Sequence, residues 1–173
     1  RHPAQRINAG ADTRREVATL AVEEPLEVRV GGQPYVVTMR TPGDDMDLAA
    51  GVLVSEGAIW NRDNLPEMRY CTTVSGRSEQ DYNTLSLTIS PDVPAPRSTR
   101  ATLMTSACGV CGVDSIDEVR RATHFPLGPA EPMIAQDVLL SLPERLRRHQ
   151  RVFDKTGGVH AAGLFTPDGQ LLC

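Results

Sequence analysis

Hydrophobic and polar residues alternate along residues 26–40, which is typical of two half-buried β-strands. The apolar positions are Leu26, Val28 and Val30 in the first strand and Tyr35, Val37 and Met39 in the second. Gly31 and Gly32 lie between the two runs, and paired glycines suit the tight turn of a hairpin. The pattern therefore predicts a β-hairpin over residues 26–40.

The apolar period lengthens after residue 40, which indicates a helix over residues 41–57. Its expected buried stripe consists of Leu48, Ala49, Val52 and Leu53. At its start, Thr41 can act as a cap, Pro42 suits the first helical position and Asp44 lies where a capping box places an acceptor. Asp45 belongs to the same stretch. A surface for a partner or cofactor is the alternative interpretation of Thr41, Asp44 and Asp45, but capping explains them without a function.

Two more strands are predicted at residues 67–74 and 82–90, where Leu85, Leu87 and Ile89 alternate with polar residues. The first part of the chain is thus expected to be a ββαββ domain over residues 21–92. Residues 1–20 are polar and are predicted to be a disordered tail. The overall fold class is α+β.

The rest of the chain divides into a linker and the start of a second domain. Residues 93–132 begin with a proline-rich stretch, carry a flexible loop with two cysteines and include a short helix at 113–122. Residues 133–173 contain a helical pattern at 135–150, which Pro143 should break or kink. They end in a strand, a Thr-Pro-Asp-Gly turn and the beginning of a returning strand over 157–173. We predict that this last segment is part of an α/β domain.

Composition narrows the class of protein. The net charge is −4, so the chain lacks the basic excess of a dedicated nucleic-acid binder. No apolar stretch is long enough to span a membrane, and the N-terminal residues contain no apolar core of a secretory signal. With only four cysteines, a disulfide scaffold is disfavoured. We therefore expect a cytoplasmic protein that binds neither membranes nor nucleic acid.

Cys108 and Cys111 form a Cys-x-x-Cys pair surrounded by glycines, and three kinds of chemistry suit it. A zinc-binding interaction module would use this pair with His124, but no fourth ligand follows at finger spacing. Cys71, His160 or Cys173 could supply that ligand only through the fold. A dithiol oxidoreductase would need a strand before the pair and a helix starting at it, whereas Gly112 separates the pair from the next helix. A glycine-rich loop suits a sulfur carrier, although two incidental cysteines are also possible on spacing alone.

Four stretches carry a resemblance to a known family. They are "EEPLEVRV", "TMRTPGDDMDLAAGVLVSEG", "CGVCGVDSIDEV" and "GGVHAAGLF", and they occur in this order. In this respect the chain resembles the formate dehydrogenase accessory sulfurtransferases, the FdhD family, from about Val22 to the end. The family's second domain resembles a cytidine deaminase, so this fold is expected to begin in residues 133–173.

The resemblance also implies an activity. Members of the family accept sulfur as a persulfide from a cysteine desulfurase and deliver it to the molybdenum cofactor, bis-molybdopterin guanine dinucleotide, for formate dehydrogenase. It implies that Cys108 carries the persulfide, that Cys111 is the second thiol, and that the protein is a homodimer with no metal of its own. His160 is a candidate for the cofactor pocket or a buried structural histidine. The other cofactor-binding residues are expected in a family segment beyond Cys173.

The remaining candidates have simple structural explanations. The basic set Arg145, Arg147, Arg148 and Arg151 could bind pyrophosphate or an acidic partner, but such a run is usually the solvated side of a helix. Cys71 and Cys173 are expected to be core residues. The three hypotheses differ in an observable way: a persulfide on Cys108 without metal, stoichiometric zinc, or a readily reversible disulfide between Cys108 and Cys111.

Overall fold

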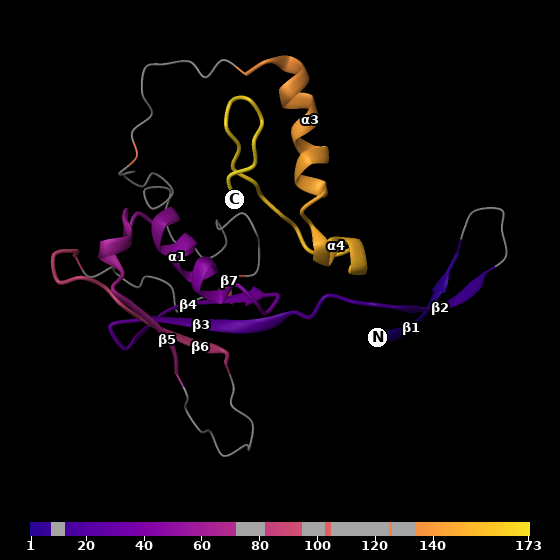
Figure 1. Cartoon of the computed structure of the whole chain (residues 1–173). Helices are drawn as coiled ribbons and strands as arrows, with labels where there is room; N and C mark the ends of the chain where they lie inside the picture. Colours follow the sequence, from indigo (N-terminus) through magenta and orange to yellow (C-terminus); the bar gives the residue numbers. More distant parts are fainter. Residues whose placement is uncertain (8–12, 72–81, 95–102, 105–124, 126–133) are drawn as a thin grey trace. The chain divides into compact units, whose positions relative to one another are not determined.

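A computed structural model describes residues 1–7, 13–71, 82–94, 103–104, 125 and 134–173. The chain divides into two compact units (Figure 1). Residues Glu23–Leu127 make up the sheet unit, and Arg1–Val22 with Gly128–Cys173 make up the terminal unit. Strands and helices both occur, so the α+β class expected from the sequence is confirmed.

The sheet unit contains a mixed five-stranded sheet in the order β5-β6-β3-β4-β7. The strands are β3 (Glu24–Val30), β4 (Gln33–Arg40), β5 (Glu67–Tyr70), β6 (Thr84–Thr88) and β7 (Leu103–Met104). The pairs β3–β4 and β5–β6 are antiparallel, whereas β3–β6 and β4–β7 are parallel. Helix α1 (Asp45–Ser55) and the 3-10 helix η1 (Arg62–Asn64) connect β4 to β5. The predicted hairpin, helix and two following strands are therefore present in the predicted order.

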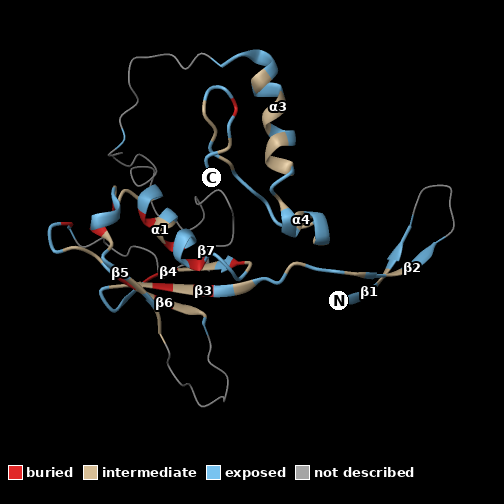
Figure 2. Cartoon of the chain, in the orientation of Figure 1, coloured by how far each residue is buried: buried red, intermediate tan, exposed pale blue. Residues whose placement is uncertain are grey.

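One face of this sheet packs against α1 and forms the core (Figure 2). The buried residues are Leu26, Val28, Tyr35, Val36, Ala49, Leu53, Ile59, Leu85 and Leu87. Side chains alternate between the two faces of a strand, so Leu85 and Leu87 lie inside while Ser86 between them does not. This period-two pattern is what made β3 and β6 recognisable in the sequence.

The start of α1 differs from the capping scheme expected at Thr41, Pro42 and Asp44. Asp44 is the N-cap residue, but no side chain makes a capping hydrogen bond, and the first helical residue is Asp45. Asp45 is 3% exposed and binds Arg40 instead. The capping prediction was wrong because it considered only hydrogen bonds to the helix backbone, whereas an ion pair with Arg40 positions this end of the helix.

The N-terminal residues form a two-stranded antiparallel sheet, in contrast to the expected disordered tail. Strand β1 (His2–Arg6) pairs with β2 (Arg14–Ala18), and we call the two together the N-terminal ribbon. The Arg6 guanidinium donates two hydrogen bonds to Glu16, at 3.0 and 3.1 Å. Backbone pairing and this ion pair need no apolar alternation, so the hydrophobic pattern gave no signal for them.

Helix α3 (Gln136–Arg147) passes through Pro143, and α4 (Arg151–Thr156) follows after a turn. The expected break at Pro143 is therefore absent, and the helices separate at residues 148–150 instead. Proline lacks the amide hydrogen that would bind the carbonyl of Leu139. Leu139 is 54% exposed, so water can reach this part of the helix and the loss of one hydrogen bond is tolerated.

The predicted turn near the C-terminus is present. The amide of Gly169 donates to the carbonyl of Thr166 at 2.8 Å, and the amide of Thr166 donates to the carbonyl of Gln170 at 2.9 Å. Phe165 and Leu171 form an isolated antiparallel bridge across it. Leu164 also exchanges backbone hydrogen bonds with Leu172 and Cys173. No strand forms in residues 157–173, however, so the two strands predicted on either side of the turn are wrong.

Parts of the predicted linker, residues 93–132, can be compared with the structure. Leu103–Met104 form β7 and pair with β4, so this short piece belongs to the sheet. The predicted helix at 113–122 lies outside the described residues, as does most of the connector at 125–132. Within the described residues, no helix is both long enough and apolar enough to cross a membrane.

Candidate functional site

The two cysteines expected to carry the chemistry, Cys108 and Cys111, lie outside the described residues, and so does His124. The described chain comes nearest to them in sequence at Met104, the last residue of β7. Met104 pairs with Thr38 at the β7 edge of the sheet. The sequence that contains the cysteine pair therefore continues from an edge strand of the sheet unit.

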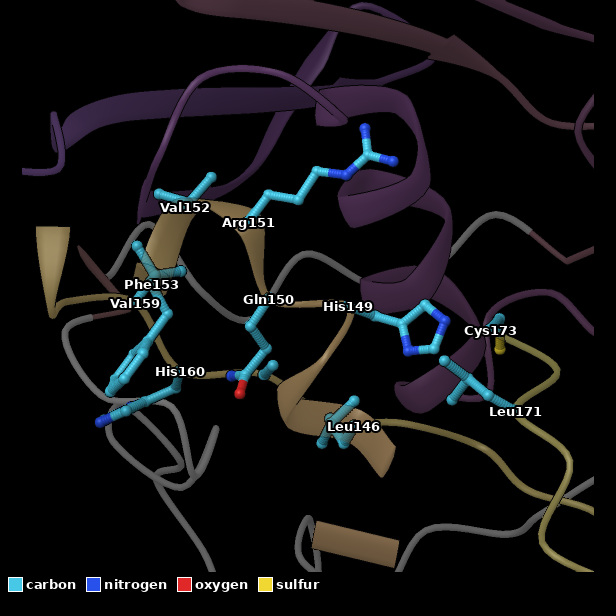
Figure 3. A pocket seen from close by; sticks show the side chains of 12 residues that line it. Leu146, His149, Gln150, Arg151, Val152, Phe153, Val159, His160, Leu171 and Cys173 are labelled. Atoms are coloured by element: carbon cyan, nitrogen blue, oxygen red, sulfur yellow. The ribbon is translucent and has the colours of Figure 1, made fainter. Parts of the chain in front are cut away.

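The terminal unit contains a pocket of about 350 Å³ (Figure 3). It is formed by the end of α3, by α4, by residues 159–162 and by the last residues of the chain. Its apolar lining residues are Leu146, Val152, Phe153, Val159, Ala161, Ala162 and Leu171, and its polar ones are His149, Gln150, Arg151, His160 and Cys173. Apolar walls with a few polar groups are typical of small-molecule sites.

His149 lies at the turn between α3 and α4, and a backbone contact orients its ring. Its Nδ1 is 3.0 Å from the carbonyl oxygen of Arg145. Because a carbonyl can only accept a hydrogen bond, Nδ1 must carry the proton in the neutral ring, which leaves the Nε2 lone pair available to a ligand. Figure 3 shows His149 on the same side of the pocket as Leu171 and Cys173. His149 was not predictable from the sequence, since a histidine at a helix end has no distinctive spacing.

His160, the candidate cofactor-binding residue, also lines this pocket, and it is exposed, so the alternative of a buried structural histidine is wrong. It follows Val159, whose φ of +80° is a left-handed conformation that β-branched residues rarely adopt. Gly157 precedes them as the left-handed cap of α4. Backbone strain of this kind is often found at functional sites, so the segment is a candidate for direct ligand contact.

The four basic residues of α3 and α4 have different environments. Arg145 donates to the carbonyl of Gly169 at 2.6 Å, and Arg147 stacks on the ring of Phe153 at 4.5 Å. Arg148 pairs with Glu144 across one turn of helix at 3.5 Å. Arg151 has no ion pair within the described chain and belongs to the pocket lining. The predicted solvated helix face therefore fits Arg148 best, and Arg151 is the one available to an anion.

The turn held by Arg145 leads to a prediction for Gly169. This glycine has a φ of +83°, and a β-carbon here would lie 2.5 Å from Nη1 of Arg145 and 2.9 Å from Val138. We expect Gly169→Ala to destabilise the terminal unit by about 1–3 kcal/mol, because both the backbone and the contact would be strained. Urea unfolding of the purified variant measures this.

Gly51 provides the matched control for that experiment. It lies in the middle of α1, and a β-carbon would meet nothing within 4 Å. Gly51→Ala should stabilise the sheet unit by about 0.5–1 kcal/mol, since alanine is the better helix former. If Gly169→Ala unfolds at the wild-type urea concentration or above, the tight contact with Arg145 is not present in solution.

A buried polar cluster lies at one end of the sheet unit, around Arg40. Its guanidinium binds both carboxylate oxygens of Asp45 at 3.1 Å, Glu24 at 3.1 Å and the side-chain oxygen of Asn83 at 3.0 Å. Burial lowers the pKa of Arg40, but the hydrogen bonds that Arg40 donates to Asp45 and Glu24 outweigh it, so the pKa is raised and Arg40 stays charged. The cluster joins α1 to three strand ends and gives Asp45 a structural role.

Tyr70 completes this cluster and provides a pH-dependent test of it. Its hydroxyl donates to Asp45 at 3.0 Å, and burial followed by this hydrogen bond raises the pKa of Tyr70. Because the pKa of Tyr70 is higher in the folded state, the protonated hydroxyl stabilises the fold. This stabilisation is complete below the pKa of tyrosine in the unfolded chain, about 10, and it is lost as the pH rises through the pKa of Tyr70 in the folded state.

We therefore expect the stability difference between the wild type and Tyr70→Phe to shrink as the pH rises above about 10. Urea unfolding at several pH values from neutral to strongly alkaline measures it, and absorbance of tyrosinate in the folded protein gives an independent titration. A stability difference that stays constant over this range would contradict the hydrogen bond between Tyr70 and Asp45.

The other two cysteines differ from the core positions predicted for them. Cys71 is partly buried and Cys173 is exposed, and both are free thiols. Within the described part of the chain, no three histidine, cysteine or acidic side chains come together as a metal site.

Comparison with known proteins identifies the family. The model of the FdhD/NarQ family matches residues 21–173. The chain belongs to this family. The FdhD/NarQ match includes all four sequence stretches in which the resemblance was found.

Curated FdhD/NarQ relatives are similar over most of the chain. "Sulfur carrier protein FdhD" of Nocardia farcinica (strain IFM 10152) is 47% identical over 164 residues, which are 95% of this chain and 58% of the relative. The protein with the same name from Streptomyces coelicolor is 45% identical over 170 residues, 96% of this chain and 60% of the relative. The chain thus spans somewhat more than half the length of these relatives.

A solved structure shares the fold. It is the crystal structure of a putative formate dehydrogenase accessory protein from Desulfotalea psychrophila, with a TM-score of 0.64 and 15% sequence identity. The similarity covers 99% of this chain and 60% of that one. At this low identity the likeness supports the mixed α+β fold and nothing about the activity.

Proposed function

We propose that this chain carries the sulfur-transfer site of an FdhD/NarQ sulfurtransferase. In this proposal it takes sulfur from a cysteine desulfurase and delivers it to bis-molybdopterin guanine dinucleotide, the molybdenum cofactor of formate dehydrogenase. The observation that supports it most is the family match over residues 21–173, which includes Cys108 and Cys111. Curated relatives at 45–47% identity have the name of a sulfur carrier.

The first step loads the carrier. The thiolate of Cys108 attacks the terminal sulfur of the desulfurase persulfide, the sulfur–sulfur bond of that persulfide breaks, and the desulfurase thiolate leaves. Cys108 then holds the transferred sulfur as its own persulfide. The desulfurase persulfide becomes a thiolate while the Cys108 thiolate becomes a persulfide, so this step needs no external oxidant or reductant.

The second thiol explains how the sulfur can be released in reduced form. The thiolate of Cys111 attacks the Sγ atom of the Cys108 persulfide, which forms a disulfide between the two cysteines and releases hydrosulfide. The two electrons that reduce the sulfur come from the dithiol. A cellular dithiol reductant must then restore the pair before the next cycle.

The pocket of the terminal unit fits a part of the cofactor. Its volume of about 350 Å³ suits one aromatic ring system rather than the whole dinucleotide. The apolar walls can enclose a planar ring, and Nε2 of His149 can bind a polar edge of it. His160 and Arg151 add groups that can contact a phosphate. We assign this pocket to one end of the cofactor on these grounds.

The same proposal includes the fold of the second domain, the oligomeric state and the cellular location of the protein. Residues 133–173 begin a cytidine-deaminase-like domain, and α3, α4 and the turn that follows supply its first elements. The protein acts as a cytoplasmic homodimer and binds formate dehydrogenase at delivery. The support is the resemblance to the family, within which the deaminase-like fold and the dimer are expected.

A mass-spectrometric experiment tests the carrier step. The reduced chain is incubated with a cysteine desulfurase and free cysteine, and added sulfur is then mapped on its peptides. We expect one sulfur on Cys108, no such modification in Cys108→Ala, and retention of the persulfide in Cys111→Ala because release needs the second thiol. Chelator should not change the result.

Cys71→Ala and Cys173→Ala are the matched controls, because each removes a thiol from the described part of the chain. Both should load sulfur as the wild type does. Unmodified Cys108 with a zinc ion in the native mass would favour the zinc-binding module. A Cys108–Cys111 disulfide that turns over on protein disulfides without loading sulfur would favour the oxidoreductase.

A further inference from the structure

The N-terminal ribbon has no hydrophobic core of its own. Its two strands pair only with each other within the described chain, and neither contains a buried residue. Val17 is 68% exposed. A two-stranded sheet alone is marginally stable in water, so this element gains most from a further strand or surface packed against it.

The charge of the N-terminal segment is opposite to that of the rest. Residues 1–22 contain four arginines against two acidic residues, whereas the rest of the chain contains 14 basic against 20 acidic residues. Such asymmetry within one chain indicates a segment that meets an oppositely charged partner.

Two arginines of β2 are available to that partner. Arg6 is occupied, because it donates two hydrogen bonds to Glu16. Arg14 and Arg15 are exposed and make no ion pair within the described residues. The free positive charge of the ribbon therefore lies on β2.

The outer edge of β2 can also accept another strand. Its sequence, Arg14–Ala18, contains no proline, whereas β1 contains Pro3 and so lacks one backbone donor. Arg15 and Val17 are two residues apart and therefore project from the same face. A strand added here would place one side chain opposite Arg15 and another opposite Val17.

We propose that β2 of the N-terminal ribbon is a docking edge for an extended acidic segment of a partner protein. The added strand pairs with the free backbone groups of β2, sets an acidic side chain against Arg15 and sets an apolar one against Val17. This is strand addition to an exposed sheet edge, with specificity from alternate side chains. The family model matches residues 21–173, and the ribbon precedes this range in sequence.

Nucleic acid and anionic lipid also attract arginines, but the ribbon fits them less well. Phosphate binding depends on many cations, and only two arginines of β2 are free. The exposed Val17 and the open backbone edge contribute nothing to phosphate recognition. Both features contribute directly when the partner is a β-strand.

The test uses the full chain and a fluorescein-labelled eight-residue peptide in which Glu and Val alternate on one face, with Thr between them. Fluorescence anisotropy should show saturable binding that weakens with salt, because charge pairing contributes to it. Hydrogen exchange should slow at the amides of β2 when the peptide is added. Arg15→Glu should lower the affinity for the peptide about tenfold, and Val17→Asp should lower this affinity as well.

Arg62→Glu is the matched control, since it makes the same charge change at an exposed arginine of the sheet unit. It should leave peptide binding unchanged. The proposal is overturned by the absence of saturable binding, by equal affinity in Arg15→Glu, or by tighter binding of duplex DNA or phosphatidylglycerol vesicles than of the peptide. Persulfide loading of Cys108 should be the same in all these variants, so failure here leaves the proposed function standing.

Discussion

Asp45→Asn is expected to destabilise the sheet unit by about 3 kcal/mol, because it leaves the charge of Arg40 buried without its main partner. The side chains of Arg40 and Asp45 are 5% and 3% exposed. Asparagine has nearly the same shape as aspartate, so the change removes the negative charge and adds little steric disturbance. Glu24 remains 3.1 Å from Arg40 in the variant and partly neutralises its charge. The expected loss of unfolding free energy is therefore at the lower end of the range for a broken buried ion pair.

Urea unfolding followed by tryptophan fluorescence measures this loss. The chain has a single tryptophan, Trp60, and it lies in the sheet unit. Asp47→Asn is the matched control, because Asp47 lies in the same first turn of α1 but is exposed. It should cost about 0.3–1 kcal/mol through the helix dipole alone. Equal losses in the two variants would show that the Arg40 cluster does not hold α1 in solution.

Leu53→Ala is expected to destabilise the same unit by about 2–5 kcal/mol. Leu53 is 0% exposed and lies in the core with Leu26 and Leu85. Alanine removes three carbon atoms from a closely packed site, so the loss combines burial with the cavity that remains. The sheet constrains the surrounding side chains, and full collapse of the cavity is not expected.

The neighbouring residue supplies the control for Leu53. Val54 is 41% exposed on the outer side of α1, so Val54→Ala should change stability by no more than about 0.5 kcal/mol. Urea unfolding with the Trp60 signal compares the two variants directly. A small effect at Leu53 or a large one at Val54 would mean that α1 presents a different face to the sheet.

The elements that were predictable from the sequence are those whose side chains alternate against one local core. Leu26 and Val28 on β3 and Leu85 and Leu87 on β6 are such cases. The prediction at the start of α1 was wrong because an aspartate at a helix start can act as a cap or as one half of an ion pair. The capping role and the ion-pair role are distinguished only by the position of Arg40, which lies five residues earlier in sequence, at the end of β4.

In the candidate site, too, some residues were predictable from the sequence and others only from the fold. His160 was identified through the resemblance of "GGVHAAGLF" to a family sequence, and the structure places it in the lining of a pocket. His149 and Arg151 line the same pocket, but His149 comes from the turn between two helices and Arg151 is the first residue of α4. Their sequence neighbours are ordinary basic residues, so nothing local separates Arg151 from the paired Arg148.

By itself, the sequence determined the α+β class, the order of the strands and α1, and membership of a family with a Cys-x-x-Cys pair at Cys108 and Cys111. These depend on periodicity and on short motifs, which are local properties of a chain. The tertiary structure alone decided the ion-pair role of Asp45, the pairing of the N-terminal ribbon and the pocket around His149. Each of these depends on side-chain contacts that only the fold creates or on backbone pairing, and neither leaves a periodic signal in the order of hydrophobic and polar residues.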